Sequence, residues 1–140
     1  MRRETSSAEE TEAAGFEVGA GLGPGDVVLV AGELGTGKTT FVRGACRALG
    51  VREPVTSPTF TIGQLYAGER SGRRLEVAHL DLYRLEALGA EEPGLLEDYL
   101  IPERVGFVEW PEIASEALAE ATVRVALQHL GGDRRRLAIS

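Results

Sequence analysis

The stretch GELGTGKTTF, residues 32–41, constrains the fold of this chain more than any other feature of its sequence. Residues 32–39 match the pattern G-x-x-x-x-G-K-[ST] of a phosphate-binding loop, which should follow a strand and precede a helix. Both neighbours are present, because residues 26–31 form a continuous apolar run and residues 38–49 carry apolar side chains at helical spacing up to Gly50. We therefore predict a strand, loop and helix that hold nucleotide phosphates at a helix N-terminus.

Lys38, inside this stretch, is the only lysine of the chain, since arginine stands at every other basic position. A lysine ammonium is a compact point charge that fits beside phosphate oxygens, whereas an arginine fork suits planar partners with two acceptor atoms. We predict that Lys38 neutralises the outer phosphates and that the glycines let backbone N–H groups point toward the anion. The Thr39 hydroxyl is predicted to bind Mg²⁺.

Size and charge narrow the possible functions. The chain has 140 residues, which favours a single domain that spans residues 1–140. We expect residues 1–5 to be a flexible start. Its 22 acidic and 15 basic residues give a net charge of −7, which disfavours direct binding to a nucleic-acid backbone. The single cysteine, Cys46, cannot form an internal disulfide. No apolar run approaches the roughly 20 residues of a membrane span, so we expect a cytoplasmic protein.

The remaining patterns predict an α/β protein with both parallel and antiparallel strands. Residues 6–11 have the S-x-x-E spacing of a capping box and should open a helix. Residues 59–66 and 74–83 alternate apolar and polar side chains, which predicts an antiparallel hairpin around a loop at 68–73. Further strands are predicted at residues 105–108, 122–128 and 136–139, and short helical patterns at residues 86–100.

Two carboxylates compete for a place beside the metal. Glu109 directly ends the apolar run at 105–108, which is typical of the metal-side acid in such folds, although it could also merely cap the element that follows. Asp81 follows a similar strand and competes for the same role. One acid would serve the metal while the other orients the attacking water, and the order stays open. His79 is expected to be a half-buried structural side chain and is not placed in the site.

Three further features have both a functional and a plain structural interpretation. Residues 56–61, which include Thr59, place hydroxyls around a proline where related folds keep a segment that senses the γ-phosphate, but they could also be an ordinary strand entry. Trp110 is expected to pack at the mouth of the site rather than in the plain core. The three arginines at residues 134–136 are typical of a solvated charge run.

Four blocks of sequence together resemble the bacterial TsaE family, small P-loop ATPases required for threonylcarbamoyladenosine formation in tRNA. The blocks are GELGTGKTTFVRG at 32–44, SPTFT at 57–61, HLDLYRL at 79–85 and VEWPE at 108–112. The first block is common to P-loop proteins, whereas all four at these spacings are specific. The resemblance covers nearly the whole chain. It implies a P-loop NTPase-like three-layer α/β fold with a mixed central sheet, in which antiparallel strands interrupt the parallel core.

The resemblance also implies which residues carry the function. Lys38, Asp81 and Glu109 would form the catalytic set, Thr39 and Glu109 would bind Mg²⁺, and Trp110 would be needed for activity. The residues implied to hold the phosphates of ATP are Gly35, Thr36, Gly37, Lys38, Thr39 and Thr40.

The two ends of the chain are implied to meet around the adenine in this family. Ser6 represents the N-terminal end and Arg135 the C-terminal end. Glu33 and Thr36 stand where the family often has Asp and Ala, and both are mild changes.

The implied partners are the transferase subunit TsaD and its companion TsaB, with low intrinsic ATPase activity expected in their absence. The acidic net charge agrees with this, since the partners would hold the tRNA. ATP is favoured over GTP, because a guanine-binding N-K-x-D element needs a lysine other than Lys38. Two alternatives remain open. One is a small-molecule phosphotransferase, for which the chain offers little length, and the other is a nucleotide-controlled interaction protein with negligible turnover.

Overall fold

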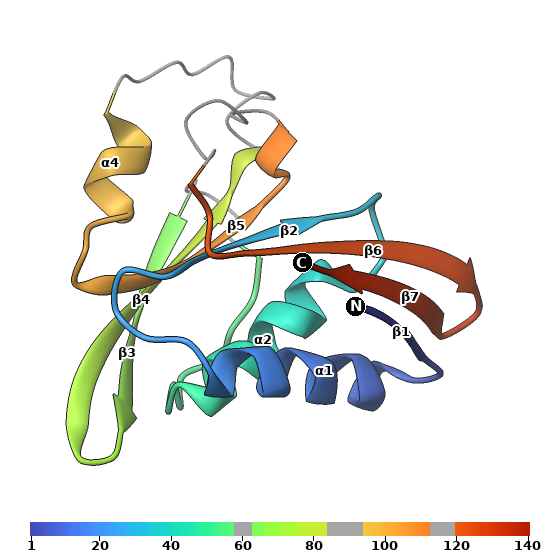
Figure 1. Cartoon of the computed structure of the whole chain (residues 1–140), viewed down its shortest axis with the longest axis horizontal. Helices are drawn as coiled ribbons and strands as arrows, with labels where there is room; N and C mark the ends of the chain where they lie inside the picture. The colour runs from blue at the N-terminus through green and yellow to red at the C-terminus, as the bar shows by residue number, and fades with distance from the viewer. Residues whose placement is uncertain (58–62, 84–93, 113–119) are drawn as a thin grey trace.

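The computed structural model describes residues 1–57, 63–83, 94–112 and 120–140, and this part is built around a mixed seven-stranded sheet (Figure 1). The strands lie in the order β1-β7-β6-β2-β5-β4-β3. Their bounds are β1 Arg2–Thr5, β2 Val27–Ala31, β3 Gly63–Arg70, β4 Arg73–Asp81, β5 Arg104–Glu109, β6 Val123–Gly131 and β7 Arg134–Ile139. The helices are α1 Ala8–Ala20, α2 Lys38–Ala48 and α4 Leu95–Tyr99.

The centre of the sheet is parallel. β6, β2, β5 and β4 run parallel to one another, whereas β7, β1 and β3 are antiparallel to their neighbours. β2 and β5 are apolar along most of their length, as expected for strands covered on both faces. The predicted α/β mixed sheet is therefore confirmed. The antiparallel strands, however, flank the parallel core at both edges and do not interrupt it.

Helices α1 and α2 lie side by side on one face of the sheet, with their backbones in close contact (Figure 1). A Cβ atom added at Gly44 would lie 1.8 Å from the carbonyl oxygen of Glu12, and one at Gly15 would lie 2.0 Å from that of Phe41. Only glycine permits such an approach. The contact holds α2, and with it the loop that precedes α2, in a fixed position over the sheet.

The opposite face of the sheet carries a second buried cluster. α4 covers it and packs against it through Leu96 and Tyr99. The cluster members on and beside the strands are Leu29, Leu80, Leu82 and Val108. The sheet thus lies between two helical layers, which confirms the predicted three-layer arrangement.

The first residues are not a flexible start, contrary to the prediction. Arg2–Thr5 forms β1 and pairs with β7, and the amino group of Met1 donates to the carbonyl oxygen of Ile139 at 2.7 Å. A strand of four mostly charged residues has no apolar pattern that could predict it. Its order comes from pairing with a strand at the other end of the chain.

The turn between β3 and β4 is shorter than the predicted loop at 68–73. Only Ser71 and Gly72 form it, with φ values of 55° and 76°, as in two-residue hairpin turns. Gly68 belongs to β3, where a Cβ atom would lie 2.4 Å from the carbonyl oxygen of Leu49. This glycine therefore marks a close backbone approach rather than a turn.

β4 is also more buried than its alternating pattern predicts. Val77 to Leu80 are all buried, because both faces of β4 are covered, with Val77 in one buried cluster and Leu80 in the other. Residues 59–62 of the predicted hairpin and residues 86–93 of the predicted helical segment lie outside the described residues. Among the helices that are described, none is long and apolar enough to cross a membrane.

Candidate nucleotide-binding site

The phosphate-binding loop connects the C-terminal end of β2 to the first residue of α2. Its backbone depends on glycine, since Gly32, Gly35 and Gly37 have φ values of 155°, 78° and 95°. A Cβ atom at Gly32 would also lie 2.8 Å from the carbonyl oxygen of Leu127. No side chain caps the N-terminus of α2, so its first N–H groups can serve an anion.

The Lys38 ammonium lies inside the loop. Its Nζ donates to the carbonyl oxygens of Gly32 at 2.7 Å and Glu33 at 2.9 Å, and only 6% of the residue is exposed. Burial lowers the pKa of Lys38, while the negative charges of Glu109 and Asp81 oppose that shift. A desolvated cation whose hydrogen-bond partners are neutral carbonyls can gain strongly from an exchange for phosphate oxygens.

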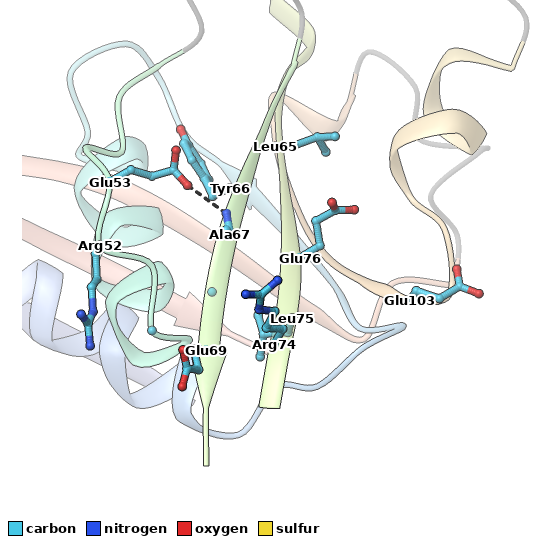
Figure 2. Close-up of a pocket in the computed structure, with 12 residues that line it drawn as sticks. Arg52, Glu53, Leu65, Tyr66, Ala67, Glu69, Arg74, Leu75, Glu76 and Glu103 are labelled. Carbon is cyan, nitrogen blue, oxygen red and sulfur yellow. Dashed lines mark hydrogen bonds between the residues drawn. The ribbon is translucent and has the colours of Figure 1, made fainter. Parts of the chain in front are cut away.

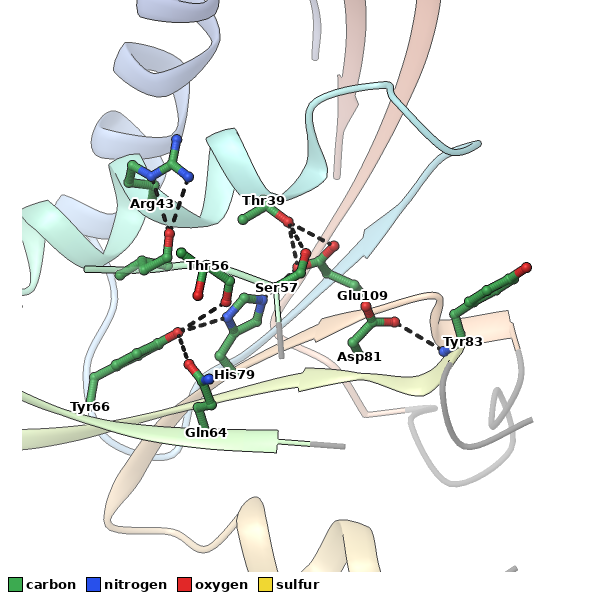
Figure 3. A network of polar contacts seen from close by, with 11 residues as sticks. Thr39, Arg43, Thr56, Ser57, Gln64, Tyr66, His79, Asp81, Tyr83 and Glu109 are labelled. Carbon is green, nitrogen blue, oxygen red and sulfur yellow. Dashed lines mark hydrogen bonds and ion pairs between the residues drawn. The ribbon is translucent and has the colours of Figure 1, made fainter. Parts of the chain in front are cut away.

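Glu109 and Asp81 occupy neighbouring positions at the ends of two parallel strands, β5 and β4 (Figure 3). Glu109 is only 2% exposed and accepts the Thr39 hydroxyl at 3.2 Å on Oε2. Thr39 Oγ1 also lies 2.7 Å from Ser57 Oγ. Burial, aided by the charge of Glu109, raises the pKa of Asp81. The two acids thus meet at the loop, with Glu109 nearer the threonine.

Trp110 lines the pocket beside Lys38 and also packs against the second buried cluster. The Lys38 Nζ is 4.4 Å from the centroid of the indole, and the Tyr83 ring packs against it at 5.0 Å. The Trp110 backbone has φ 60°, a conformation that a bulky residue adopts only when its surroundings impose it. The β5 terminus therefore places Glu109 and Trp110 on the loop together.

A pocket of about 230 Å³ unites these groups. It is lined by Leu34, Gly35, Gly37, Lys38, Thr39, Thr40, Ser57, Asp81, Glu109 and Trp110. The predicted phosphate, metal and catalytic side chains thus converge on one cavity. Thr36 is the exception, since it is buried beneath the loop and its hydroxyl donates to the carbonyl oxygen of Glu33. Thr59 lies outside the described residues.

The two residues predicted near the adenine, Ser6 and Arg135, lie outside the main pocket. Arg135 donates to the carbonyl oxygens of Thr36 at 3.0 Å and Gly35 at 3.1 Å, so it supports the loop and is not part of a solvated charge run. It lines a small pocket of about 50 Å³ together with Ala8, Thr11, Gly37, Thr40 and Asp133. Ser6 does not line this pocket. Its N–H donates to Glu10 Oε1, next to the cap that Ser7 provides for α1.

The residue that the sequence interpretation underrated is His79. It is fully buried, and its Nε2 lies 2.5 Å from Glu109 Oε2. One available signal was its spacing, because His79 and Asp81 are two residues apart on a strand and therefore share a face. Its pattern suggested half burial, whereas the core covers the face of β4 that His79 shares with Val77 and buries it completely.

The donor atoms in the P-loop pocket fit Mg²⁺. A hydroxyl and a buried carboxylate are oxygen ligands of the kind that Mg²⁺ prefers. Within the described ranges, no group of three or more His, Cys, Asp and Glu side chains could hold a metal ion.

A larger hollow of about 1090 Å³ lies at the edge of the sheet formed by β3 and β4 (Figure 2). It contains none of the predicted site residues. Its arginines are Arg52 and Arg74, and its acids are Glu53, Glu69, Glu76 and Glu103. The hollow has no glycine loop or helix N-terminus directed at an anion, so the smaller P-loop pocket is the candidate site.

The chain is similar to known proteins over almost its whole length. A family model described as "Threonylcarbamoyl adenosine biosynthesis protein TsaE" matches residues 5–137. The tRNA threonylcarbamoyladenosine biosynthesis protein TsaE of Treponema pallidum is 36% identical over 140 residues, which cover 100% of both chains. The protein of the same name from Bacillus subtilis is 34% identical, over 100% of this chain and 85% of that protein. The crystal structure of Bacillus subtilis YdiB matches with a TM-score of 0.78 and 30% identity, over 99% of this chain and 83% of YdiB.

Proposed function

Because the chain belongs to the TsaE family, which takes part in the biosynthesis of threonylcarbamoyladenosine in tRNA, we propose that it binds ATP with Mg²⁺ and hydrolyses the ATP in support of that modification. The observation that carries the proposal is the convergence of Lys38, Thr39 and Glu109 on one pocket at the N-terminus of α2. The Thr39 hydroxyl and the Glu109 carboxylate are in hydrogen-bond contact there. A buried carboxylate beside a P-loop threonine is an arrangement suited to metal-assisted phosphate chemistry.

The loop holds the phosphates in this proposal. The N–H groups at the start of α2 and the Lys38 ammonium donate to phosphate oxygens, which replace the carbonyl partners of Lys38. Thr40 lines both the main pocket and the smaller pocket next to Arg135. We therefore propose that the nucleoside part of ATP extends toward the smaller pocket.

Thr39 and Glu109 would hold Mg²⁺, which when bound neutralises charge that develops on the phosphates. Asp81 lies beside Glu109, and burial raises its pKa, so it is suited to accept a proton from, or to orient, the attacking water. Trp110 covers Lys38 and limits access of bulk water to it.

The proposed partners are TsaD and TsaB, with tRNA held by them. The net charge of −7 supports an indirect relation to tRNA, because direct binding requires clustered basic side chains. In this role ATP hydrolysis maintains repeated turnover of the transferase and does not itself transfer the threonylcarbamoyl group.

The test measures phosphate release from ATP by the full chain, alone and with TsaD and TsaB, together with formation of the modified nucleoside in tRNA. We expect slow release alone, faster release with the partners, and little sustained modification when the chain is omitted. Release that requires a small-molecule hydroxyl acceptor would instead indicate a phosphotransferase. Tight ATP binding without release under any of these conditions would indicate a nucleotide-controlled interaction protein.

A further inference from the structure

The polar contacts of Glu109 continue inward from the pocket to His79 (Figure 3). The imidazole is 0% exposed, and its Nε2 lies 2.5 Å from Glu109 Oε2. An ionised carboxylate only accepts hydrogen bonds, so Nε2 must carry the hydrogen of this contact. Glu109 is thus held by two donors, the Thr39 hydroxyl on the pocket side and the imidazole on the core side.

The imidazole is oriented from its other side by Tyr66. The Tyr66 hydroxyl lies 3.3 Å from His79 Nδ1 and 2.7 Å from Gln64 Oε1, and Nδ1, as the ring nitrogen without a hydrogen, can accept from it. Tyr66 comes from β3 and is only 3% exposed. A histidine whose two ring nitrogens both face polar partners in the core has a defined ring orientation.

These contacts also reach the segment that precedes residue 58. The Tyr66 hydroxyl lies 3.4 Å from the carbonyl oxygen of Thr56, and the next residue, Ser57, contacts Thr39. The contacts therefore form a loop. They run from Thr39 to Glu109, then through His79 and Tyr66 to Thr56, whose neighbour Ser57 contacts Thr39 again.

We propose that His79 is a positioning residue that fixes the Glu109 carboxylate in the orientation facing Thr39 and thereby sets the Mg²⁺ dependence of nucleotide binding. This inference rests on the proposed function, because it assumes that Glu109 serves the metal. A histidine that only filled the core would be replaceable by an apolar side chain of similar volume. Here such a replacement would leave a buried carboxylate without one of its two donors, and groups that hydrogen-bond to a metal ligand typically change metal affinity about 10- to 100-fold when removed.

The test titrates Mg²⁺ into the full chain with a non-hydrolysable ATP analogue and records analogue binding. His79→Leu keeps volume without polar atoms, whereas His79→Gln offers an amide nitrogen near the position of Nε2. We expect His79→Leu to raise the Mg²⁺ concentration for half-maximal binding about 10- to 100-fold, and His79→Gln to restore most of the loss. Metal-free binding of the analogue should stay within about twofold. Leu22→Ala, a buried core change just beyond α1 that lines neither pocket, controls for general destabilisation and should leave the Mg²⁺ dependence unchanged.

A double-mutant cycle with Glu109→Gln decides whether the effect passes through Glu109. In the Glu109→Gln background, His79→Leu should add less than about a twofold change. An equal effect of His79→Leu in both backgrounds, or equal behaviour of the leucine and glutamine variants, would overturn the positioning role while the proposed function stands. Should the leucine variant not fold, His79→Asn, whose shorter side chain cannot place a donor at the position of Nε2, takes its place in the same cycle. A wild-type protein that binds the analogue without any dependence on Mg²⁺ would overturn the proposed function and this inference with it.

Discussion

The surroundings of Lys38 allow its ammonium to exchange its present hydrogen-bond partners for phosphate oxygens. Its ammonium is buried, contacts two loop carbonyls and lies over the Trp110 ring, and burial lowers its pKa. A compact cation can leave these carbonyls for a phosphate within the same narrow space. The chemical reason for a lysine in a chain of arginines is thus local to the loop.

We expect Lys38→Arg to fail as a conservative substitution. The larger planar guanidinium does not fit the loop interior, so ATP affinity should fall about 10- to 100-fold, the range for a lost charge-assisted hydrogen bond. Calorimetric titration with ATP checks the value. Arg47→Lys, at an exposed ion pair with Glu12, is the matched control and should bind ATP normally. Wild-type affinity in Lys38→Arg would contradict the phosphate assignment.

The two acids at the ends of β4 and β5 should separate by function. Glu109 contacts Thr39, so Glu109→Gln should raise the Mg²⁺ concentration needed for ATP hydrolysis, because the amide keeps the shape but loses the charge. Asp81→Asn should leave Mg·ATP binding within a few fold while hydrolysis with TsaD and TsaB falls at least about 100-fold. Binding and single-turnover measurements on both variants test this. The reverse pattern would exchange the two roles and leave the ATPase proposal intact.

At the scale of elements, the position of the loop depends on the contact between α1 and α2. This contact is made by backbones, because glycines occupy the points of closest approach. The sheet fixes the position of the C-terminal end of β2, and packing against α1 fixes the position and direction of α2. The geometry of the pocket therefore depends on residues that never touch the nucleotide.

Gly44→Ala should destabilise the fold strongly. The added Cβ atom would lie 1.8 Å from the Glu12 carbonyl oxygen, and backbone at that distance cannot yield cheaply, so we expect a loss of about 1–3 kcal/mol or more in the free energy of unfolding. Urea denaturation followed by circular dichroism measures it. Gly21→Ala is the matched control, since its nearest atom would be 3.7 Å away and its φ is −95°. Equal stability of both variants would contradict the close packing.

At the scale of the whole molecule, Cys46 reports on opening of the fold. The thiol is fully buried between α2 and the sheet, and burial raises its pKa to about 12. Between its ordinary value near 9.0 and about 12, the unfolded chain loses this proton while the folded chain keeps it. The thiol therefore makes stability decline as the pH rises through that window.

Alkylation of Cys46 by iodoacetamide at pH 8 should accordingly be slow in the native protein and fast in urea. Because labelling requires opening of the core, saturating Mg·ATP should slow it further by stabilising the folded state. The rate is measured by mass spectrometry of the intact chain, with denatured protein as the reference. Rapid labelling of the native protein would contradict the burial of this thiol.

Local patterns of the sequence were sufficient for the strand, loop and helix around Lys38 and for a carboxylate at the end of the β5 strand. The reason is that a buried parallel strand, a glycine loop and an amphipathic helix each leave a pattern within a few neighbouring residues. Local sequence also predicts that both faces of the sheet are covered, because the β2 and β5 strands are apolar on both faces. The three-layer α/β fold was predictable on those grounds and from the resemblance.

Only the tertiary structure determined which side chains on different strands of the sheet contact each other. The contact between His79 and Glu109 depends on β4 pairing with β5 in one register, and the contact of Arg135 with the loop depends on β7 lying beside β6. β1 is ordered because Arg2–Thr5 pairs with β7 at the other end of the chain and contacts α1 through Arg3 and Thr5. Strand order and register follow from the packing of the whole core, so no short segment of sequence contains them.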